Sequence, residues 1–140
     1  MRDQTQQSVF LVSACLMGLC TRYDGATRPD NECRDFLRKS ICIPVCPEQL
    51  GGLPTPRPPA EIIDGDGRDV LRGKARIITI NGEDVTASFI QGAQQVLQLA
   101  RLQDISGVCL KARSPSCGVS ETMGVTTALL AEHGYSLYEF

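Results

Sequence analysis

The sequence predicts a single-domain α/β fold in which a mostly parallel sheet is flanked by helices. Segments rich in β-branched and aromatic residues alternate along the chain with segments of helical periodicity, which is the pattern of parallel strands joined by helical crossovers. The chain has 140 residues, the size of one ordinary domain, with 42% apolar and 21% charged residues. We therefore expect residues 1–140 to form one three-layer, Rossmann-like domain.

The first predicted elements are a strand, a short helix and a second strand. Residues 9–12 (VFLV) are β-branched and aromatic, as in a buried strand. Residues 32–39 can form a helix that Asp30 or Asn31 would cap. Residues 41–45 (ICIPV) are the second strand.

The middle of the chain contains many residues that break regular structure. Pro44 is awkward in a central strand and suggests a bulge or the end of the strand. Residues 51–59 (GGLPTPRPP) predict a long extended loop, and loops of this kind are usually functional. Residues 64–67 predict a turn. Residues 75–80 predict the third strand of the sheet.

The last third of the chain alternates between helix and strand. Residues 85–102 carry an apolar stripe at helical spacing, and Asp84 is expected to cap this helix. Residues 107–111 predict a fourth strand, residues 124–132 a final helix, and residues 135–138 a last strand.

Charge and hydropathy exclude several classes of protein. The net charge of −2 and the pI of about 5.4 do not fit a general nucleic-acid binder, which is usually basic. No apolar run approaches the roughly 20 residues of a membrane span. The apolar stretch 9–20 has the length of a signal-peptide core, but Ser13 and Gly18 interrupt it and Asp3 precedes it. We expect a cytoplasmic protein.

Three of the cysteines share one context. The chain has seven cysteines, at positions 15, 20, 33, 42, 46, 109 and 117. In a reducing compartment such residues indicate metal binding or catalysis more often than disulfides, and no CxxC pair is present. Cys15, Cys46 and Cys117 each follow a predicted strand. Ligands of open parallel sheets bind at the carboxyl ends of the strands, so we expect these thiols to converge.

The other candidate ligands are interpreted as structural. Cys42 and Cys109 lie inside predicted strands, where cysteine behaves as a small hydrophobic residue. Cys20 and Cys33 have no assigned role, although Cys20 remains a candidate fourth ligand. His133, the one histidine, is expected to be a cation at a helix C-terminus.

The chemistry of three thiolates leaves several metals open. Soft thiolates suit zinc, copper(I) or an iron–sulfur cluster, and a closed zinc site requires a fourth ligand. A [4Fe–4S] cluster with three cysteine ligands keeps one iron open as a Lewis acid. Glu48, Ser114 and Ser116 lie close in sequence to these cysteines and could form an acid–base pair. Glu48 and Ser116 could equally cap helix starts, and spacing alone does not decide.

Longer motifs resemble those of the thiouracil desulfurase (TudS) family. They run in order over nearly the whole chain: VSACLMG (12–18), RYDG (22–25), CPEQLGGLPTPRPPAEI (46–62), DVLRGKAR (69–76), LKARSPSCG (110–118) and GVTTALL (124–130). The motifs at 46–62 and 110–118 are long and specific enough to make chance similarity negligible. One departure is the segment 119–123, which is shorter than in relatives.

The resemblance implies a cofactor and a reaction. A [4Fe–4S] cluster would be held by Cys15, Cys46 and Cys117. The thiocarbonyl sulfur of a thiolated pyrimidine would bind the open iron, and water would attack the carbon that carries it. The products would be the uracil form and sulfide, without net redox change.

The resemblance also implies roles for the neighbouring residues. Glu48 would be the general base or proton shuttle, and Ser114 would position or relay a proton, with Ser116 the weaker candidate for that role. Arg22, Arg57 and Arg113 lie in the motif loops, and their charge alone indicates that they could bind a nucleotide phosphate or the pyrimidine carbonyls. The residues alone leave a second interpretation of these arginines, namely ion pairs with Asp24, Asp30 or Glu61.

Substrate and partners stay open at this point. A free thiobase, a thionucleoside and a thionucleotide all fit, whereas the acidic charge disfavours thiolated tRNA without excluding it. A homodimer is compatible with an incomplete sheet edge. Two non-catalytic alternatives are a metal site that only staples the loops and a protein that captures sulfide.

Overall fold

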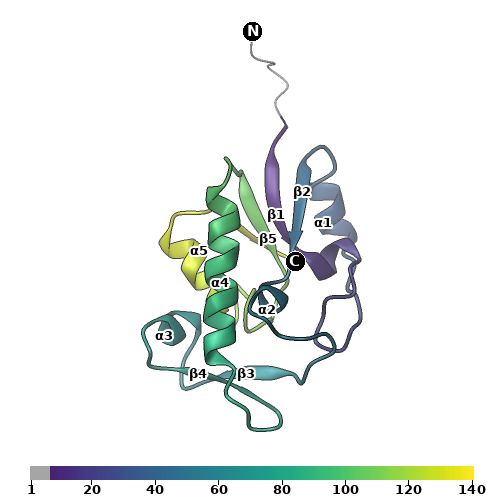
Figure 1. Cartoon of the computed structure of the whole chain (residues 1–140). Helices are drawn as coiled ribbons and strands as arrows, with labels where there is room; N and C mark the ends of the chain where they lie inside the picture. The colour runs from purple at the N-terminus through teal and green to yellow at the C-terminus, as the bar shows by residue number, and fades with distance from the viewer. Residues whose placement is uncertain (1–6) are drawn as a thin grey trace.

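The computed structural model describes residues 7–140, and its centre is a four-stranded, all-parallel sheet (Figure 1). The strands are β1 (Val9–Ser13), β2 (Ile41–Val45), β5 (Gly107–Leu110) and β6 (Leu137–Glu139), in the order β2-β1-β5-β6. All four coincide with predicted strands to within two residues. The expected mostly parallel α/β fold is confirmed.

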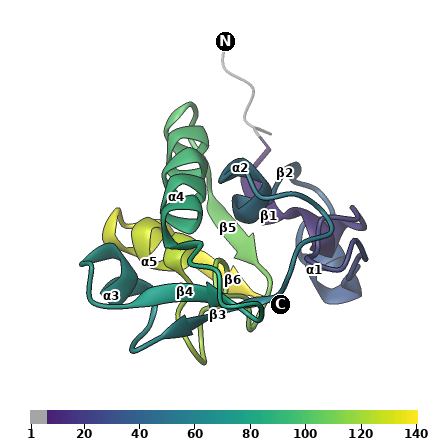
Figure 2. The ribbon, with the colours of Figure 1, turned by 60° about the horizontal axis from the view of Figure 1, so that its bottom comes forward.

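Helices cover both faces of this sheet. Neighbouring side chains of a strand point to opposite faces, so in β1 Leu11 packs with Val96 and Ala100 of α4 (Thr86–Arg101). Val12 of the same strand packs instead with Cys33 of α1 (Asn31–Phe36). Figure 2 shows α1 on one side of the sheet and α4 with α5 (Val125–Glu132) on the other. The result is a three-layer arrangement.

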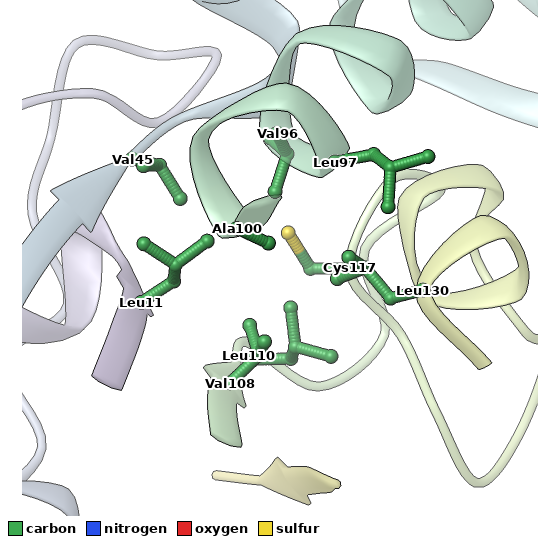
Figure 3. Packing of buried hydrophobic residues seen from close by; sticks show 9 residues of the cluster. All are labelled: Leu11, Val45, Val96, Leu97, Ala100, Val108, Leu110, Cys117 and Leu130. Carbon is green, nitrogen blue, oxygen red and sulfur yellow. The ribbon is translucent and has the colours of Figure 1, made fainter. Parts of the chain in front are cut away.

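The larger core cluster joins the sheet to α4 and α5, and Figure 3 shows its side chains. Its buried members are Leu11, Val45, Val96, Leu97, Ala100, Val108, Leu110, Cys117 and Leu130. Cys117 belongs to this cluster although it lies in a loop. The loop that carries it is therefore anchored directly in the core.

The third predicted strand does not belong to the main sheet. β4 (Arg76–Thr79) pairs antiparallel with β3 (Ala60–Ile63) in a separate two-stranded sheet at one end of the molecule (Figure 1). Ile77 packs there against Val70 of α3 (Gly67–Leu71) and Phe89 of α4. The apolar run correctly indicated a strand, but the expected place in the parallel sheet was wrong. Local composition carries no information about the pairing partner.

Turn and cap residues account for the smaller differences. Asp30 caps α1 as predicted, accepting the Cys33 backbone N–H at 2.8 Å. The predicted turn at 64–67 is a bend at Asp64 and Gly65 that leads into α3, which Asp66 caps. Asp84 lies one residue too early to be the N-cap of α4, and its carboxylate accepts the Thr86 N–H at 2.9 Å.

Pro44 needs no bulge because β2 is an edge strand. Its register with β1 runs unbroken through Val12↔Pro44. At the edge of a sheet, the N–H that proline lacks would have had no strand partner, so no hydrogen bond of the sheet is lost. None of the helices in the described part of the chain combines the length and apolar character needed to cross a membrane.

Candidate functional site

A cavity of about 320 Å³ opens at the carboxyl ends of β1, β2 and β5. Cys15, Cys46 and Cys117 all line it, as do Glu48 and Ser114. The structure thus brings the three cysteines of the strand ends to one place. This is the edge where open parallel sheets bind ligands.

Each cysteine is held by a different local structure. Cys15 lies in the short 3₁₀ helix η1 (Ala14–Met17) that follows β1 directly. Cys46 is the N-cap residue of α2 (Pro47–Leu50), a helix too short to have been predicted from periodicity. Cys117 is fixed through its carbonyl, which accepts the Thr127 hydroxyl at 2.8 Å. The backbone therefore sets the positions of all three thiols before any ligand binds.

Burial dominates the ionisation of two of the thiols. Complete burial raises the pKa of Cys117 to about 12, although hydrogen bonds with Ser13 and Ser116 lower it in part. Burial, and then the neighbouring Cys46, raise the pKa of Cys15 as well, against the opposing effect of Lys111. Without a metal, both thiols keep their protons at neutral pH. A metal that binds them must displace those protons.

Two serines and one glutamate form a hydrogen-bonded chain beside the thiols. The Ser116 hydroxyl donates to Glu48 Oε2 at 3.0 Å, and the Ser114 and Ser116 hydroxyl oxygens lie 2.9 Å apart. Ser114 Oγ also accepts the backbone N–H groups of Ser116 (3.2 Å) and Cys117 (3.1 Å). Because the Ser116 proton is directed at Glu48, Ser114 must donate to Ser116.

Arg57 holds the other side of Glu48. Its Nε donates to Glu48 Oε1 at 2.9 Å, and the side chains of Arg57 and Glu48 are only 5% and 15% exposed. The remaining guanidinium N–H groups contact Pro54 O, Thr55 Oγ1, Thr21 O and Cys46 Sγ. All five donors of the arginine therefore have protein partners. These contacts fix Glu48 and the loop 51–59, and Arg57 also lines the cavity.

The other two candidate arginines remain closer to solvent. Arg22 lines the cavity and lies over the Tyr23 ring at 5.7 Å. Arg113 also lines it and pairs with Glu121 at 3.5 Å. The acidic partners of Arg57 and Arg113 are therefore Glu48 and Glu121, and not the aspartates or Glu61 considered from the sequence.

The alternative of helix capping for Glu48 and Ser116 is wrong. Glu48 lies in the first turn of α2, which has no side-chain cap hydrogen bond, and its carboxylate is directed at Arg57 and Ser116. The N-cap of α5 is Gly124. Ser116 meets α5 through its backbone carbonyl, which accepts the Thr126 N–H at 2.9 Å. Neither side chain is therefore used to cap a helix, and both line the cavity.

Several lining residues were not predicted. They are Ser13, Thr21, Tyr23, Arg28 and Lys111. The Lys111 N–H donates to Ser13 Oγ at 3.0 Å, which joins the ends of β1 and β5. The sequence signal that could have identified Lys111 as a lining residue was its position at the end of a buried strand. Nothing in the local sequence separates Arg28 from any other loop arginine.

Cys20 and His133 lie outside this cavity. Cys20 is exposed and does not line it. His133 is the C-cap residue of α5, as expected from the sequence. Cys109 is buried in the core among apolar residues, as predicted, and Cys33 lies in the same cluster.

The donor set that the cavity offers to a metal group consists of three thiols among basic side chains. Within residues 7–140, no three His, Cys, Asp or Glu side chains are arranged to hold one metal ion. In a [4Fe–4S] cluster each thiolate binds a different iron, so the thiols stand apart around the cluster. Arg22, Arg28 and Lys111 line the same cavity and would offset the negative charge of three thiolates. Three thiols and a basic cavity therefore suit this group.

The fold and the cavity define an α/β protein whose site lies at the carboxyl edge of a parallel sheet. The chain belongs to the 2-thiouracil desulfurase family, whose model matches residues 10–139. The resemblance of the motifs is thereby confirmed.

Two related proteins cover almost the whole chain. A solved structure named as the [4Fe–4S]-dependent thiouracil desulfidase TudS has a TM-score of 0.76 and 36% sequence identity, covering 96% of this chain and 91% of its own. YbbK of Bacillus subtilis (strain 168), described as an uncharacterized protein, is 42% identical over 139 residues, or 91% of this chain and 92% of YbbK.

Proposed function

We propose that this protein removes sulfur from thiolated pyrimidines by hydrolysis, with a [4Fe–4S] cluster bound by Cys15, Cys46 and Cys117. The observation that carries the proposal is the chain Ser114–Ser116–Glu48–Arg57, which lies beside three thiols in one cavity. A site that only stapled loops together would not need such a chain. The family and the solved TudS relative support the same chemistry.

The overall reaction balances without an electron donor or acceptor. The pyrimidine carbon loses sulfur as sulfide and gains oxygen from water, so its oxidation state does not change. When bound, the cluster supplies an iron without a protein ligand, which can act as a Lewis acid towards the thiocarbonyl sulfur. The side chains of the protein must then position the water molecule and accept a proton from it.

Glu48 is the group suited to accept that proton. Its two carboxylate oxygens receive one hydrogen bond each, from Arg57 Nε and the Ser116 hydroxyl. A carboxylate offers about four acceptor positions, so two remain for a water molecule in the cavity. The two fixed contacts orient the carboxylate, and a positioned base of this kind raises rates by about two to four powers of ten.

The two serines have different parts in this scheme. Both serines line the cavity, but Ser116 is buried and touches Glu48, whereas Ser114 is only half-buried. Ser114 is therefore the hydroxyl closer to a substrate, and Ser116 links it to the base. Protonation of Glu48 would allow both hydroxyls to turn and return the proton towards the leaving sulfur.

The cysteine assignment is tested by metal analysis of variants. We expect about four irons and four sulfides per chain in protein purified without oxygen. Replacement of Cys15, Cys46 or Cys117 by serine should remove them. Cys20→Ser is the matched control, because Cys20 is exposed and outside the cavity, and it should keep the iron content. Full iron in all three variants, or zinc in the native protein, contradicts the assignment.

A further inference from the structure

Three cysteines outside the cavity gather beneath α1, on the face of the sheet opposite α4. Cys33 of α1 and Cys109 of β5 are buried members of one core cluster, and the partly buried Cys42 of β2 packs against it. Neither Cys33 nor Cys109 is exposed to solvent. Packing alone makes them small hydrophobic residues. Three thiols in one cluster are also the components of a disulfide.

The pairing of the strands decides which of these thiols can bond. Cys42 lies opposite Phe10 and Cys109 lies opposite Val12, so β1 separates the two strand cysteines. Adjacent strands are about 4.8 Å apart, which puts the Cα atoms of Cys42 and Cys109 more than roughly 9 Å apart. A disulfide needs about 4.4 to 6.8 Å between its Cα atoms. Any disulfide within this cluster therefore includes Cys33, which lies above the sheet on α1.

Cys109 is the neighbour that Cys33 meets through its thiol. A hydrogen bond from Cys109 lowers the pKa of Cys33, against the opposing effects of burial and of Asp30. The same hydrogen bond, followed by burial, raises the pKa of Cys109. The pair therefore ionises at Cys33, while Cys109 keeps its proton and donates it. A thiolate is the form of cysteine that reacts with oxidants.

We propose that Cys33 and Cys109 form an oxidation site that hydrogen peroxide converts into a reversible disulfide. The Cys33 thiolate attacks the peroxide, the O–O bond breaks, and hydroxide leaves as Cys33 becomes a sulfenic acid. The Cys109 sulfur then attacks the sulfenic sulfur, the S–S bond forms, and the Cys109 proton leaves with the hydroxyl group as water. The two thiols lose two electrons in total, and the peroxide gains both.

The short helix α1 gives the oxidant access to the buried pair. It has six residues, of which Cys33 alone is buried, and Phe36 at its end is 45% exposed. Short elements with few buried contacts open locally while the rest of the domain stays folded. A molecule as small as hydrogen peroxide can therefore reach Cys33 when α1 opens.

The disulfide would also restrain the wall of the cavity that carries Cys15. Segment 27–30 connects η1 to α1, and its Arg28 N–H donates to the Cys15 carbonyl at 3.0 Å. A bond between α1 and β5 therefore limits the motion of η1 as well. The proposal does not depend on the proposed reaction, because neither Cys33 nor Cys109 lines the cavity.

Peptide mapping of the native protein tests the pairing. The cluster-loaded protein is treated with hydrogen peroxide, its free thiols are alkylated, and it is digested with trypsin without reductant. Trypsin cleaves after lysine and arginine except before proline, so Cys33 is the one cysteine of peptide 23–34 and Cys109 that of peptide 102–111. We expect mass spectrometry to find these two peptides linked, and dithiothreitol to separate them.

Cys42→Ser is the matched control, because Cys42 packs against the same cluster without belonging to the pair. This variant should keep the link, whereas Cys33→Ser and Cys109→Ser should abolish it. Two results would overturn the proposal. One is a link from peptide 23–34 to any other cysteine peptide. The other is alkylation of both Cys33 and Cys109 at a peroxide concentration that oxidises the exposed Cys20.

Urea unfolding without reductant is a second measurement of the same bond. The oxidised native protein should unfold at a higher urea concentration than the same sample after dithiothreitol, because the bond restrains the unfolded chain between residues 33 and 109. Cys33→Ser protein treated in the same way should show no such rise. An equal or lower midpoint for the oxidised native protein would contradict a disulfide that the fold accommodates.

Discussion

The Ser116 hydroxyl donates a hydrogen bond to Glu48 Oε2 at 3.0 Å across 68 residues of sequence. Ser116 is buried, and Glu48 is held from its other side by Arg57. The contact joins the motif after β2 to the motif after β5 in the wall of the thiol-lined cavity. It joins two motifs that are far apart in the sequence into one candidate acid–base unit.

Replacement of Glu48 by glutamine should remove the base and leave the cavity intact. The amide keeps the shape of the side chain and an acceptor for Arg57, but it cannot take a proton. We expect kcat to fall by about two to four powers of ten at unchanged iron content. Steady-state desulfuration and iron analysis on the same samples measure both quantities.

The exposed Glu83→Gln variant is the control for that measurement and should match the native protein. Native turnover by Glu48→Gln with a full cluster would favour the alternative that the metal site is only structural or captures sulfide.

A double-mutant cycle between Glu48 and Ser116 tests whether the two act as one unit. Ser116→Ala removes the hydroxyl that orients Glu48, and Glu48→Gln removes the base. Groups that work together lose less in combination than the sum of their single losses. We therefore expect the double variant to be about as slow as Glu48→Gln alone. Independent, additive losses in log kcat would show that Ser116 does not act through Glu48.

Arg57 should contribute more to the free energy of unfolding than an exposed arginine does. Arg57→Met leaves the Glu48 carboxylate without its ion-pair partner in a largely buried place. Loss of one member of such a pair costs about 3 kcal/mol of unfolding free energy. Urea unfolding followed by circular dichroism measures the loss, with the exposed Arg34→Met as control. A loss as small as that of the control would contradict the structural role.

Glu139 should make the 119–120 loop sensitive to acid. Partial burial raises the pKa of Glu139, but hydrogen bonds from Ser120 and Val119 outweigh it and hold the pKa below its ordinary value of 4.5. The carboxylate therefore stabilises the fold at pH values above about 4.5, and this stabilisation disappears as pH falls through the lower folded-state pKa.

The difference in unfolding free energy between the native protein and Glu139→Gln measures this contribution. In iron-free samples of both proteins, we expect it to be constant at neutral pH and to shrink below pH about 4.5. A difference that stays unchanged in acid would mean that the loop is held by other contacts.

The sequence was sufficient to predict the helices and strands that are long or strongly patterned. The apolar stripe of α4 and the four short runs of apolar or aromatic residues in the main sheet predicted their type and approximate bounds. β3, α2 and α3 have only four or five residues each, too few to show a period. The pairing of β4 with β3 was also unpredictable, because pairing depends on the path of the chain between them.

For the site, the sequence predicted where the cysteines lie but not which residues contact one another. Parallel-strand geometry placed Cys15, Cys46 and Cys117 at one edge from sequence order alone. The hydrogen-bond partners of Arg57 were not predictable, because the acceptors that surround its guanidinium come together only when the chain folds.

The most direct test of the proposed function combines cluster analysis with turnover in one sample. Protein is purified without oxygen, assayed for iron and sulfide, and mixed with thiouracil or thiouridine without added reductant or oxidant. We predict about four irons per chain, loss of the thiocarbonyl absorption, and one sulfide released for each uracil or uridine formed. A fully loaded cluster with no change in that absorption, or stoichiometric zinc in place of iron, would contradict the proposed desulfuration.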